Sequence, residues 1–274
     1  MSKKHNGLLW RVLKIWATCL ILAFCVLGVI AVKRVGVPVV TMYREASKDV
    51  AKSSKDTFKA EQTSLVYDAE GNEIKKLKQE KDVSYLDYED IPDAAKLAII
   101  SIEDKNFTTH HGIDVEGVAR AGLSLILNRG NITMGGSTIT QQLLKNNVFT
   151  NWTSESTQLE RFTRKIQEQY LAVQVEKKTD KDTILENYLN TINLGAGSYG
   201  VQAAARQYFD KDVWDLNLSE CATLAGITQN PTKFNPIINP DSNRKRRKEV
   251  LQHMLDQNYI TQDQYDEALA DDVY

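Results

Sequence analysis

The amino-acid sequence predicts a mostly α-helical fold preceded by one transmembrane helix. Three observations support this prediction: an uncharged apolar run near the N-terminus, recurrent helix signals from residue 92 onward, and a single short stretch with strand and turn signals. The chain has 274 residues, of which 42% are hydrophobic and 26% are charged. This composition excludes a disordered chain and a polytopic membrane protein, and the length outside the apolar run suffices for one sizeable domain.

Net charge and cysteine spacing argue against two further classes. The net charge is only −2, so no overall basic field indicates a nucleic-acid partner. The three cysteines, Cys19, Cys25 and Cys221, have the spacing of neither a disulfide framework nor a zinc site. We interpret them as small buried apolar residues, and the sequence predicts no metal site.

The apolar run at residues 15–32 has the length of a membrane anchor. At about 1.5 Å per residue it nearly spans a hydrocarbon core of roughly 30 Å. Cations precede the run at Lys3, Lys4, Arg11 and Lys14. The positive-inside rule therefore places the tail at 1–14 in the cytoplasm and everything after the anchor at 15–35 outside, although Lys33 and Arg34 weaken this orientation. A cleaved signal peptide is the alternative, but the run is long for one and lacks a small-x-small cleavage site. We expect a single-pass protein of the cell membrane.

The next segments connect the anchor to the predicted helices. Residues 36–63 are polar and charged, which is typical of a solvated stalk or linker. Runs with strand character at 64–68 and 73–74 flank the turn-forming residues 69–72, and this pattern predicts a small β-hairpin. We therefore expect the extracytoplasmic domain to cover residues 64–274.

Helix signals then follow in order along this domain. The first helix is predicted at 92–103, because Pro92 is favoured at the first helical position. Asp114 is a suitable cap for a second helix that ends at Leu127, and Thr138 with Gln141 forms the capping-box pattern of a third. The remaining helices are predicted at about 156–176, 181–192, 200–209, 219–228, 243–257 and 262–270.

The predicted helix at 156–176 has two distinct faces. Its apolar residues form one stripe at helical spacing, which we expect to face the core: Leu159, Phe162, Ile166, Tyr170 and Val173. The roughly opposite side carries Arg161, Arg164, Lys165 and Glu168, and Ala172 continues that side with a small side chain that leaves room for something to approach. Such a face is often only solvated, with salt bridges such as Arg164–Glu168. Three cations around one carboxylate also suit a pyrophosphate-bearing substrate.

Two further stretches carry residue types that fit catalysis or anion binding. Glu103 and Asp104 lie where an apolar helix ends and a loop begins, which suits acid–base chemistry. We interpret Asp104 and His110 as structural residues, a helix-end hydrogen-bond acceptor and a packing residue. Residues 135–142 place small, hydroxyl and amide side chains at a helix N-terminus, which predicts an anion site, with an ordinary cap as the alternative. Lys145 adds a positive charge one turn further on.

Five blocks of the sequence, in order, resemble the glycosyltransferase domain (glycosyltransferase family 51) of class A penicillin-binding proteins and monofunctional peptidoglycan glycosyltransferases. The blocks are Glu103-Asp104-x-x-Phe107-x-x-His110-x-Gly112, Gly135 through Ser137-Thr138-Ile139-Thr140-Gln141-Gln142, Arg164-Lys165-x-x-Glu168-x-x-x-Ala172, Lys181 through Ala204-Ala205, and Glu220-Cys221-Ala222 through Asn235-Pro236. Five blocks in the correct order over residues 64–257 are highly specific, and these positions show no departure from the family's pattern.

This resemblance implies a fold and an activity. The fold would be a lysozyme-like α-helical head with a smaller, membrane-facing jaw that contains residues 115–131. For that stretch, core packing is an equally good interpretation of the sequence alone. The activity would be polymerisation of lipid II into β-1,4 glycan strands. The acceptor hydroxyl attacks C1 of the muramic sugar of the growing lipid-linked chain, the anomeric centre inverts, and undecaprenyl pyrophosphate leaves.

The resemblance also implies roles for individual residues. Glu103 matches the family's general base, and a weakly acidic hydroxyl needs such a positioned carboxylate. Glu168 matches the second carboxylate, near the leaving group and the cations Lys165 and Arg161, which stabilise negative charge on pyrophosphate. The other residues expected to bind substrate are Phe107, Ser137, Thr138, Gln141, Gln142, Lys145 and Arg164.

The expected partners follow from the same resemblance. They are lipid II, the growing lipid-linked glycan, the lipid bilayer and other cell-wall synthesis or division proteins, with moenomycin as an inhibitor. The sequence requires no cofactor, and a divalent cation, Mg²⁺ or Mn²⁺, at the pyrophosphate stays an open alternative.

Two other functions stay open at this point. A lysozyme-like fold with Glu103 as acid would cleave glycan, but a neutral glycan bond needs no cation cluster such as that of the 156–176 helix. A non-catalytic scaffold that binds lipid II is the other alternative, and the presence of both Glu103 and Glu168 argues against it.

Many members of the family carry a transpeptidase domain after this one. The only S-x-x-K element here is Ser242-Asn243-Arg244-Lys245, and no K-T-G follows it. We interpret Ser242 or Asn243 as a helix cap and the following cations as surface or phosphate-binding residues. We therefore expect the sequence to be the N-terminal piece of a longer bifunctional protein.

Overall fold

The computed structural model describes residues 82–127, 135–149 and 154–274, the strands at 64–67 and 73–77, and seven separate residues between 16 and 44. By its internal contacts the chain divides into two units, Met1–Lys52 and Ser53–Tyr274, and the elements named below belong to the second. The predicted tail, anchor and stalk lie outside the described residues except for those seven. In the part that the structure describes, no helix is both long and apolar enough to cross a membrane.

The prediction of a mostly helical fold is confirmed. Helix bounds in the second unit are α3 (Asp93–Glu103), α4 (Val115–Leu127), α5 (Ile139–Asn147), α6 (Gln158–Glu176), α7 (Lys181–Thr191), α8 (Val201–Phe209), α9 (Leu218–Ile227), α10 (Pro240–Asp256) and α11 (Gln262–Ala270), with 3-10 turns η3 (Tyr88–Asp90) and η5 (Val213–Asp215). Most of these helices begin and end within one or two residues of the predicted bounds.

Within the described residues, four short strands accompany the helices. The predicted hairpin is present: β1 (Ser64–Tyr67) pairs antiparallel with β2 (Glu73–Leu77), with an irregularity between Val66 and Tyr67. A second pair, β3 (Asp82–Val83) parallel to β4 (Ser198–Tyr199), was not predicted, because two-residue strands carry no periodic signal.

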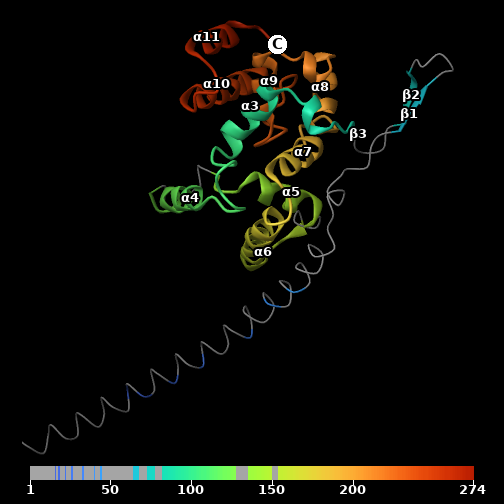
Figure 1. Cartoon of the computed structure of the whole chain (residues 1–274). Coiled ribbons are helices and arrows are strands. Elements are labelled where there is room, and N and C mark those ends of the chain that lie inside the picture. The colour runs from blue at the N-terminus through green and yellow to red at the C-terminus, as the bar shows by residue number, and fades with distance from the viewer. Residues whose placement is uncertain are drawn as a thin grey trace, which may run out of the picture. The chain divides into compact units, whose positions relative to one another are not determined.

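The helices pack in two groups, visible in Figure 1. In the first group α3, α10 and α11 pack around α9, in which every residue from Ser219 to Ile227 is buried. In the second group α5 packs against both α6 and α7. Helix α8 contacts α7 and α9 and so connects the groups. The candidate site lies where α3 and α9 of the first group meet α5 of the second.

Several helix starts are fixed by side-chain caps. Complete capping boxes join Thr157 to Glu160 at α6, Asn217 to Glu220 at α9, and Thr261 to Gln264 at α11. The predicted box at α5 is only half formed. Thr138 accepts from the backbone N–H of Gln141, but the amide of Gln141 donates to the carbonyl of Gly112 instead of returning to the helix start.

The prediction for the faces of α6 is wrong. Phe162 of the apolar stripe is 61% exposed, and Ile166, Tyr170 and Val173 are only half-buried. The side that faces the protein interior is the one predicted to be polar, where Glu168, Leu171, Ala172 and Val175 are all buried. The physical reason is that cations on the same helix compensate the charge of Glu168, so that this side can pack against α5.

The predicted start of α10 is also wrong. The helix begins at Pro240 after Asn239, three residues before the predicted start, with Pro at a favoured first-turn position. Asn243 is therefore not a cap but a buried residue of the helix interior. Its amide donates to the carbonyls of Thr223 and Phe234, and it accepts from the hydroxyl of Tyr274.

Candidate active site

Glu103 is the last residue of α3, and its half-buried carboxylate receives two hydrogen bonds from neutral donors. Gln142 Nε2 donates to Oε2 at 2.7 Å, and Thr228 Oγ1 donates to Oε1 at 2.5 Å. Gln142 belongs to α5, whereas Thr228 directly follows α9. The carboxylate is therefore held between the two groups of helices.

Tyr188 of α7 determines which way Gln142 points. The Tyr188 hydroxyl donates to Gln142 Oε1 at 3.1 Å, so the amide nitrogen of Gln142 is the atom that faces Glu103. Tyr188 is fully buried, and this burial, together with the charges of Glu103 and Asp104, raises the pKa of its hydroxyl well above the ordinary value. Tyr188 consequently keeps its hydroxyl proton, and its bond to Oε1 holds Gln142 in the orientation in which the amide nitrogen donates to Glu103.

Glu168 is fully buried and is paired with cations from its own helix. Arg164 Nη1 hydrogen-bonds to Oε1, and Lys165 Nζ donates to Oε2 at 2.8 Å. Lys165 Nζ also donates to Ser137 Oγ at 2.6 Å, which connects α6 to the segment that precedes α5. A buried carboxylate is tolerated when both oxygens are paired in this way.

Arg164 is shared between two carboxylates. Its Nε donates to Glu155 Oε1 at 2.7 Å while Nη1 binds Glu168. Burial by itself would lower the pKa of the guanidinium, but the hydrogen bonds and charges of Glu155 and Glu168 outweigh it and raise that pKa. The cations of α6 with exposed surface are Lys165, whose side chain is 37% exposed, and Arg161, which is exposed and makes no ion pair with a described residue.

Lys145 of α5 couples the two carboxylates electrostatically. Burial lowers the pKa of its ammonium group, and the charges of Lys165 and Arg164 lower it further. The charges of Glu168 and Glu103 act in the opposite direction, so Lys145 lies within the field of both acids. Glu103 and the cation-bound Glu168 are thus parts of one charged site.

The loop after Glu103 approaches α6 without an intervening side chain. Gly112 has φ +90°, and a Cβ at this position would lie 2.5 Å from the carbonyl carbon of Ala172 and 2.6 Å from the backbone nitrogen of Val173. The small side chain of Ala172 was expected to leave room for an approaching group. That group is the backbone of Gly112.

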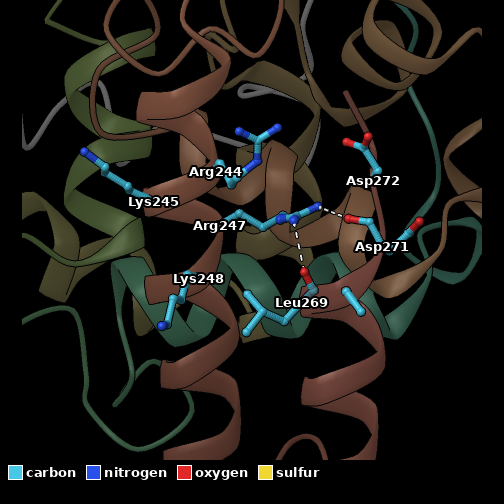
Figure 2. Close-up of a pocket in the computed structure, with 8 residues that line it drawn as sticks. Arg244, Lys245, Arg247, Lys248, Leu269, Asp271 and Asp272 are labelled. Atoms are coloured by element: carbon cyan, nitrogen blue, oxygen red, sulfur yellow. Dashed lines mark hydrogen bonds between the residues drawn. The ribbon is translucent and has the colours of Figure 1, made fainter.

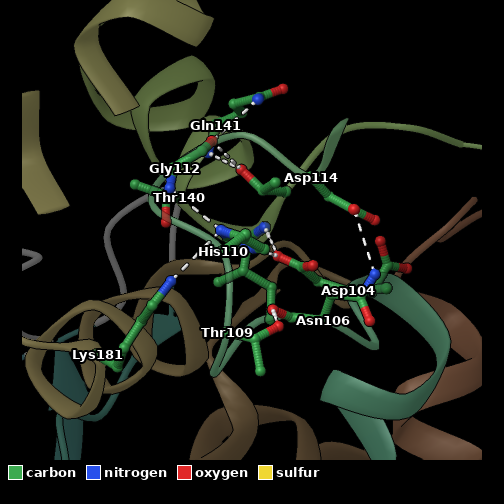
Figure 3. A network of polar contacts seen from close by, with 12 residues as sticks. Asp104, Asn106, Thr109, His110, Gly112, Asp114, Thr140, Gln141 and Lys181 are labelled. Atoms are coloured by element: carbon green, nitrogen blue, oxygen red, sulfur yellow. Dashed lines mark hydrogen bonds and ion pairs between the residues drawn. The ribbon is translucent and has the colours of Figure 1, made fainter. Parts of the chain in front are cut away.

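A buried network of hydrogen bonds holds this loop in place (Figure 3). His110 Nε2 donates to Asp104 Oδ2 at 2.9 Å, and the N–H of Gly112 donates to His110 Nδ1 at 3.1 Å. Because Nδ1 accepts, the ring proton lies on Nε2. Asp104 Oδ2 also accepts from the N–H of Ile139, the first residue of α5, so the network joins the loop to that helix. These contacts agree with the interpretation of Asp104 and His110 as structural.

Three of the residues expected to bind substrate are buried instead. Phe107 is 2% exposed and packs edge-on against His110 with Lys181 over its ring. Thr138 and Gln141, at 1% and 0% exposed, both donate to the carbonyl of Gly112. Their geometry suits positioning of the loop. By contrast, Glu103, Ser137, Gln142, Lys145 and Lys165 are half-buried at the site, and Arg161 is exposed.

Four contributing residues were missed by sequence reasoning. Thr228 holds Glu103, Glu155 holds Arg164, and a further pair lies under the loop, where Lys181 Nζ donates to Glu176 Oε2 at 2.7 Å. Of these four residues, the sequence indicated only Lys181, as the first residue of the fourth family block, and gave it no role. Thr228 lies 125 positions from Glu103, Glu155 lies outside α6, and Glu176 and Lys181 belong to different helices, so the spacing within one helix could not identify these pairs.

A separate surface pocket of about 440 Å³ lies between α10 and the segment after α11 (Figure 2). Its lining includes cations that the sequence predicted as surface or phosphate-binding residues. The lining residues are Arg244, Lys245, Arg247, Lys248, Leu269, Ala270, Asp271 and Asp272. Among the residues that the structure describes, no cluster of three or more His, Cys, Asp or Glu side chains could hold a metal ion.

Comparisons with known proteins fit these observations. The transglycosylase family model matches residues 70–255. The chain is 40% identical to penicillin-binding protein 1A of Clostridium botulinum over 219 residues, which are 77% of this chain and 26% of that protein. It is 44% identical over 208 residues to penicillin-binding protein 1A of Aquifex aeolicus, with 76% and 27% covered, and 38% identical over 263 residues to that of Neisseria meningitidis, with 95% and 31% covered.

The chain thus spans between a quarter and a third of the length of these relatives. Among solved structures it matches penicillin-binding protein 1A of Haemophilus influenzae at a TM-score of 0.43 and 24% identity, over 79% of this chain and 21% of that one. The family match covers most of the described helices and every residue of the site around Glu103 and Glu168. The chain therefore belongs to the transglycosylase family, as a glycosyltransferase domain of the class A penicillin-binding protein type.

Proposed function

We propose that this chain is a peptidoglycan glycosyltransferase that polymerises lipid II into β-1,4 glycan strands and releases undecaprenyl pyrophosphate. The observation that carries the proposal is one site with two differently held carboxylates. Among the described residues, the donors to Glu103 are the neutral groups of Gln142 and Thr228, whereas Glu168 is bound by two cations. The first arrangement suits a group that must accept a proton, and the second suits a region that receives an anion.

Glu103 acts as the general base in this proposal. As the acceptor's hydroxyl oxygen bonds to C1 of the muramic sugar, the O–H bond breaks and its proton passes to Glu103. The bond between C1 and the pyrophosphate oxygen breaks, and its electron pair leaves with undecaprenyl pyrophosphate. Attack from the face opposite the leaving group inverts the anomeric centre. Hydrogen bonds from Gln142 and Thr228 hold the carboxylate in position during the proton transfer.

The leaving pyrophosphate is bound by the cations around Glu168. Lys165 and Arg161 have exposed surface from which to contact an anion, and Lys145 contributes a third positive charge. Glu168 holds Lys165 in place, because the ammonium group bridges it to Ser137. Charge that develops on the leaving oxygen would be stabilised by cations already in position. A divalent cation, Mg²⁺ or Mn²⁺, that assists at the pyrophosphate is part of the proposal only as an option.

The variant Glu103→Gln tests the proposal in purified full-length chain with lipid II as substrate. The amide has the same shape but cannot take a proton, so we expect kcat to fall by about a hundredfold or more. Glu267→Gln, the same change at an exposed residue of α11, is the matched control and should keep full activity.

The products distinguish the proposed activity from its alternatives. Growth of glycan chains from lipid II, sensitive to moenomycin and lost in Glu103→Gln, supports the proposal. Shortening of preformed glycan would mean a hydrolase, and binding of lipid II without turnover would mean a scaffold. Undiminished polymerisation by Glu103→Gln would rule out this glutamate as the base.

We also propose that the domain works at the outer face of the cell membrane, anchored through residues 15–35. Helix α4 supports a membrane-facing role for the jaw. Val115, Val118 and Leu123 are 76%, 38% and 57% exposed, which favours an amphipathic helix over core packing. A lipid-linked donor and its growing product would be partners at such a surface, alongside other cell-wall synthesis or division proteins.

A further inference from the structure

Thr228 has a single hydroxyl proton and two acceptors for it. Its Oγ1 lies 2.5 Å from Glu103 Oε1 and 2.8 Å from the carbonyl oxygen of Ala225, one turn earlier in α9. A hydroxyl can donate to only one of them at a time, but its oxygen can accept while its proton is used elsewhere. The protonation state of Glu103 therefore decides which way this hydroxyl points.

The other side of Glu103 cannot adapt in this way. The amide nitrogen of Gln142 has only protons to offer, and the hydroxyl of Tyr188 holds the amide in that orientation. Oε2 of Glu103 therefore faces a fixed donor in both protonation states. Oε1 is the oxygen whose neighbour can change from donor to acceptor.

We propose that Thr228 is a positioning residue that accommodates both protonation states of the base, and that Oε1 is the oxygen that carries the proton after each transfer. With Glu103 ionised, Thr228 donates to Oε1. After Glu103 has taken the proton of the acceptor hydroxyl, the Thr228 hydroxyl turns to the Ala225 carbonyl and accepts a hydrogen bond from Oε1–H. Release of that proton to solvent returns both groups to the starting state. This inference rests on the proposed role of Glu103.

The other groups around Glu103 do not change from donor to acceptor as Thr228 does. The charge of Glu103 acts on the ammonium group of Lys145 on α5 and on the neutral hydroxyl of Tyr188 on α7, and Asp104 follows Glu103 in the chain. From α10, which packs on α3, the amide of Gln257 reaches the carbonyl of Ser101 instead. Among these neighbours only Thr228 both donates to a carboxylate oxygen and has a second acceptor within reach.

The test compares Thr228→Val, which keeps the shape and removes the hydroxyl, with Thr228→Ser, which keeps the hydroxyl. For Thr228→Val with lipid II we expect kcat to fall roughly tenfold to a hundredfold, which corresponds to a hydrogen bond to a charged group, with KM changed less than about twofold. The acidic limb of its pH–rate profile should move to higher pH, because the ionised carboxylate has lost a donor and gained an apolar neighbour. Thr228→Ser should restore both kcat and the pH profile.

Thr191→Val is the matched control. Thr191 also donates to a carbonyl of its own helix, that of Asn187 at 2.7 Å, but it is bonded to no carboxylate of the described residues. A wild-type kcat and pH profile in Thr228→Val, or a Thr228→Ser variant as impaired as the valine variant, would overturn the inference. If Thr228→Val does not fold, Thr228→Ala replaces it with the same expectations. Full activity of Glu103→Gln would instead refute the proposed function itself, so the two failures are distinguishable.

Discussion

At the scale of single residues, the two carboxylates of the site differ in how their charges are compensated. Glu168 is enclosed and meets a guanidinium and an ammonium group, so its charge is balanced by direct contact. Among the described residues, Glu103 accepts hydrogen bonds from an amide and a hydroxyl, and it also lies within the electrostatic influence of Lys145. The difference lies in the neighbours, since the side chains are identical. Sequence reasoning identified both acids but not Thr228, whose partner is 125 positions away.

Lys145 should make donor binding depend on pH. Its pKa is lowered, chiefly by burial, so its positive charge is lost at a lower pH than that of an ordinary lysine. As the pH rises through that pKa, attraction for pyrophosphate falls and KM for lipid II should rise. In Lys145→Arg the guanidinium stays charged, and KM should stay flat over the same range. Steady-state kinetics between about pH 7 and 10 measure this, and an identical alkaline rise in the arginine variant would contradict it.

At the scale of elements, the sequence predicted where most helices begin and end but not which side of α6 is buried. Caps such as Thr157 with Glu160 act within one turn, so helix bounds can be read locally. The buried side of a helix depends on its neighbours. Here the neighbours of α6 are α5 and the backbone of Gly112, and the latter lies directly against the backbone of Ala172 and Val173. Hydrophobic periodicity alone therefore selected the wrong face.

Gly112→Ala should disrupt the site at this contact. The new Cβ would overlap the backbone of Ala172 and Val173 at a φ of +90°, where side chains are strained. We expect a loss of roughly 2–4 kcal/mol in the free energy of unfolding and a large loss of kcat. Urea unfolding and lipid II turnover measure the two effects.

Two further variants identify the cause of that loss. Gly135→Ala is the stability control, because a Cβ there would meet nothing within 4 Å. Ala172→Gly added to Gly112→Ala should not restore stability, since the overlapping atoms are backbone atoms. Recovery in this double variant would show that side-chain crowding, not backbone contact, limits the approach.

At the scale of the whole molecule, the buried arginine of α10 joins segments that are distant in the chain. Arg247 is 2% exposed and donates to Ser219 Oγ of α9 at 2.8 Å. Figure 2 shows its bonds to the carbonyl of Asp271, at 3.0 Å, and to that of Leu269. The sequence showed this residue only as part of a basic run and gave no sign that it is buried. Its burial depends on how α9, α10 and the segment after α11 come together, and a local pattern cannot report that.

Arg247→Met should therefore be costly, because it removes the donor to the buried Ser219 Oγ and to the part-buried carbonyl of Asp271. We expect it to lower the free energy of unfolding by roughly 2–4 kcal/mol. The neighbouring exposed Arg244, which pairs with Asp241, serves as control, and Arg244→Met should cost less than about 1 kcal/mol. Chemical denaturation followed by circular dichroism compares them, and equal losses would show that burial of Arg247 is not the cause.

The direct contact between Gly112 and α6 also bears on how this site could be altered to accept other donors. The loop that follows Glu103 and the helix that carries Arg161, Arg164 and Lys165 meet backbone to backbone. No side chain at this crossing can be enlarged or trimmed to change the separation between them. Adaptation to a donor with a shorter or longer phosphate bridge would therefore need an insertion or deletion in the backbone, and libraries of point substitutions at this crossing should yield inactive variants instead of new specificities.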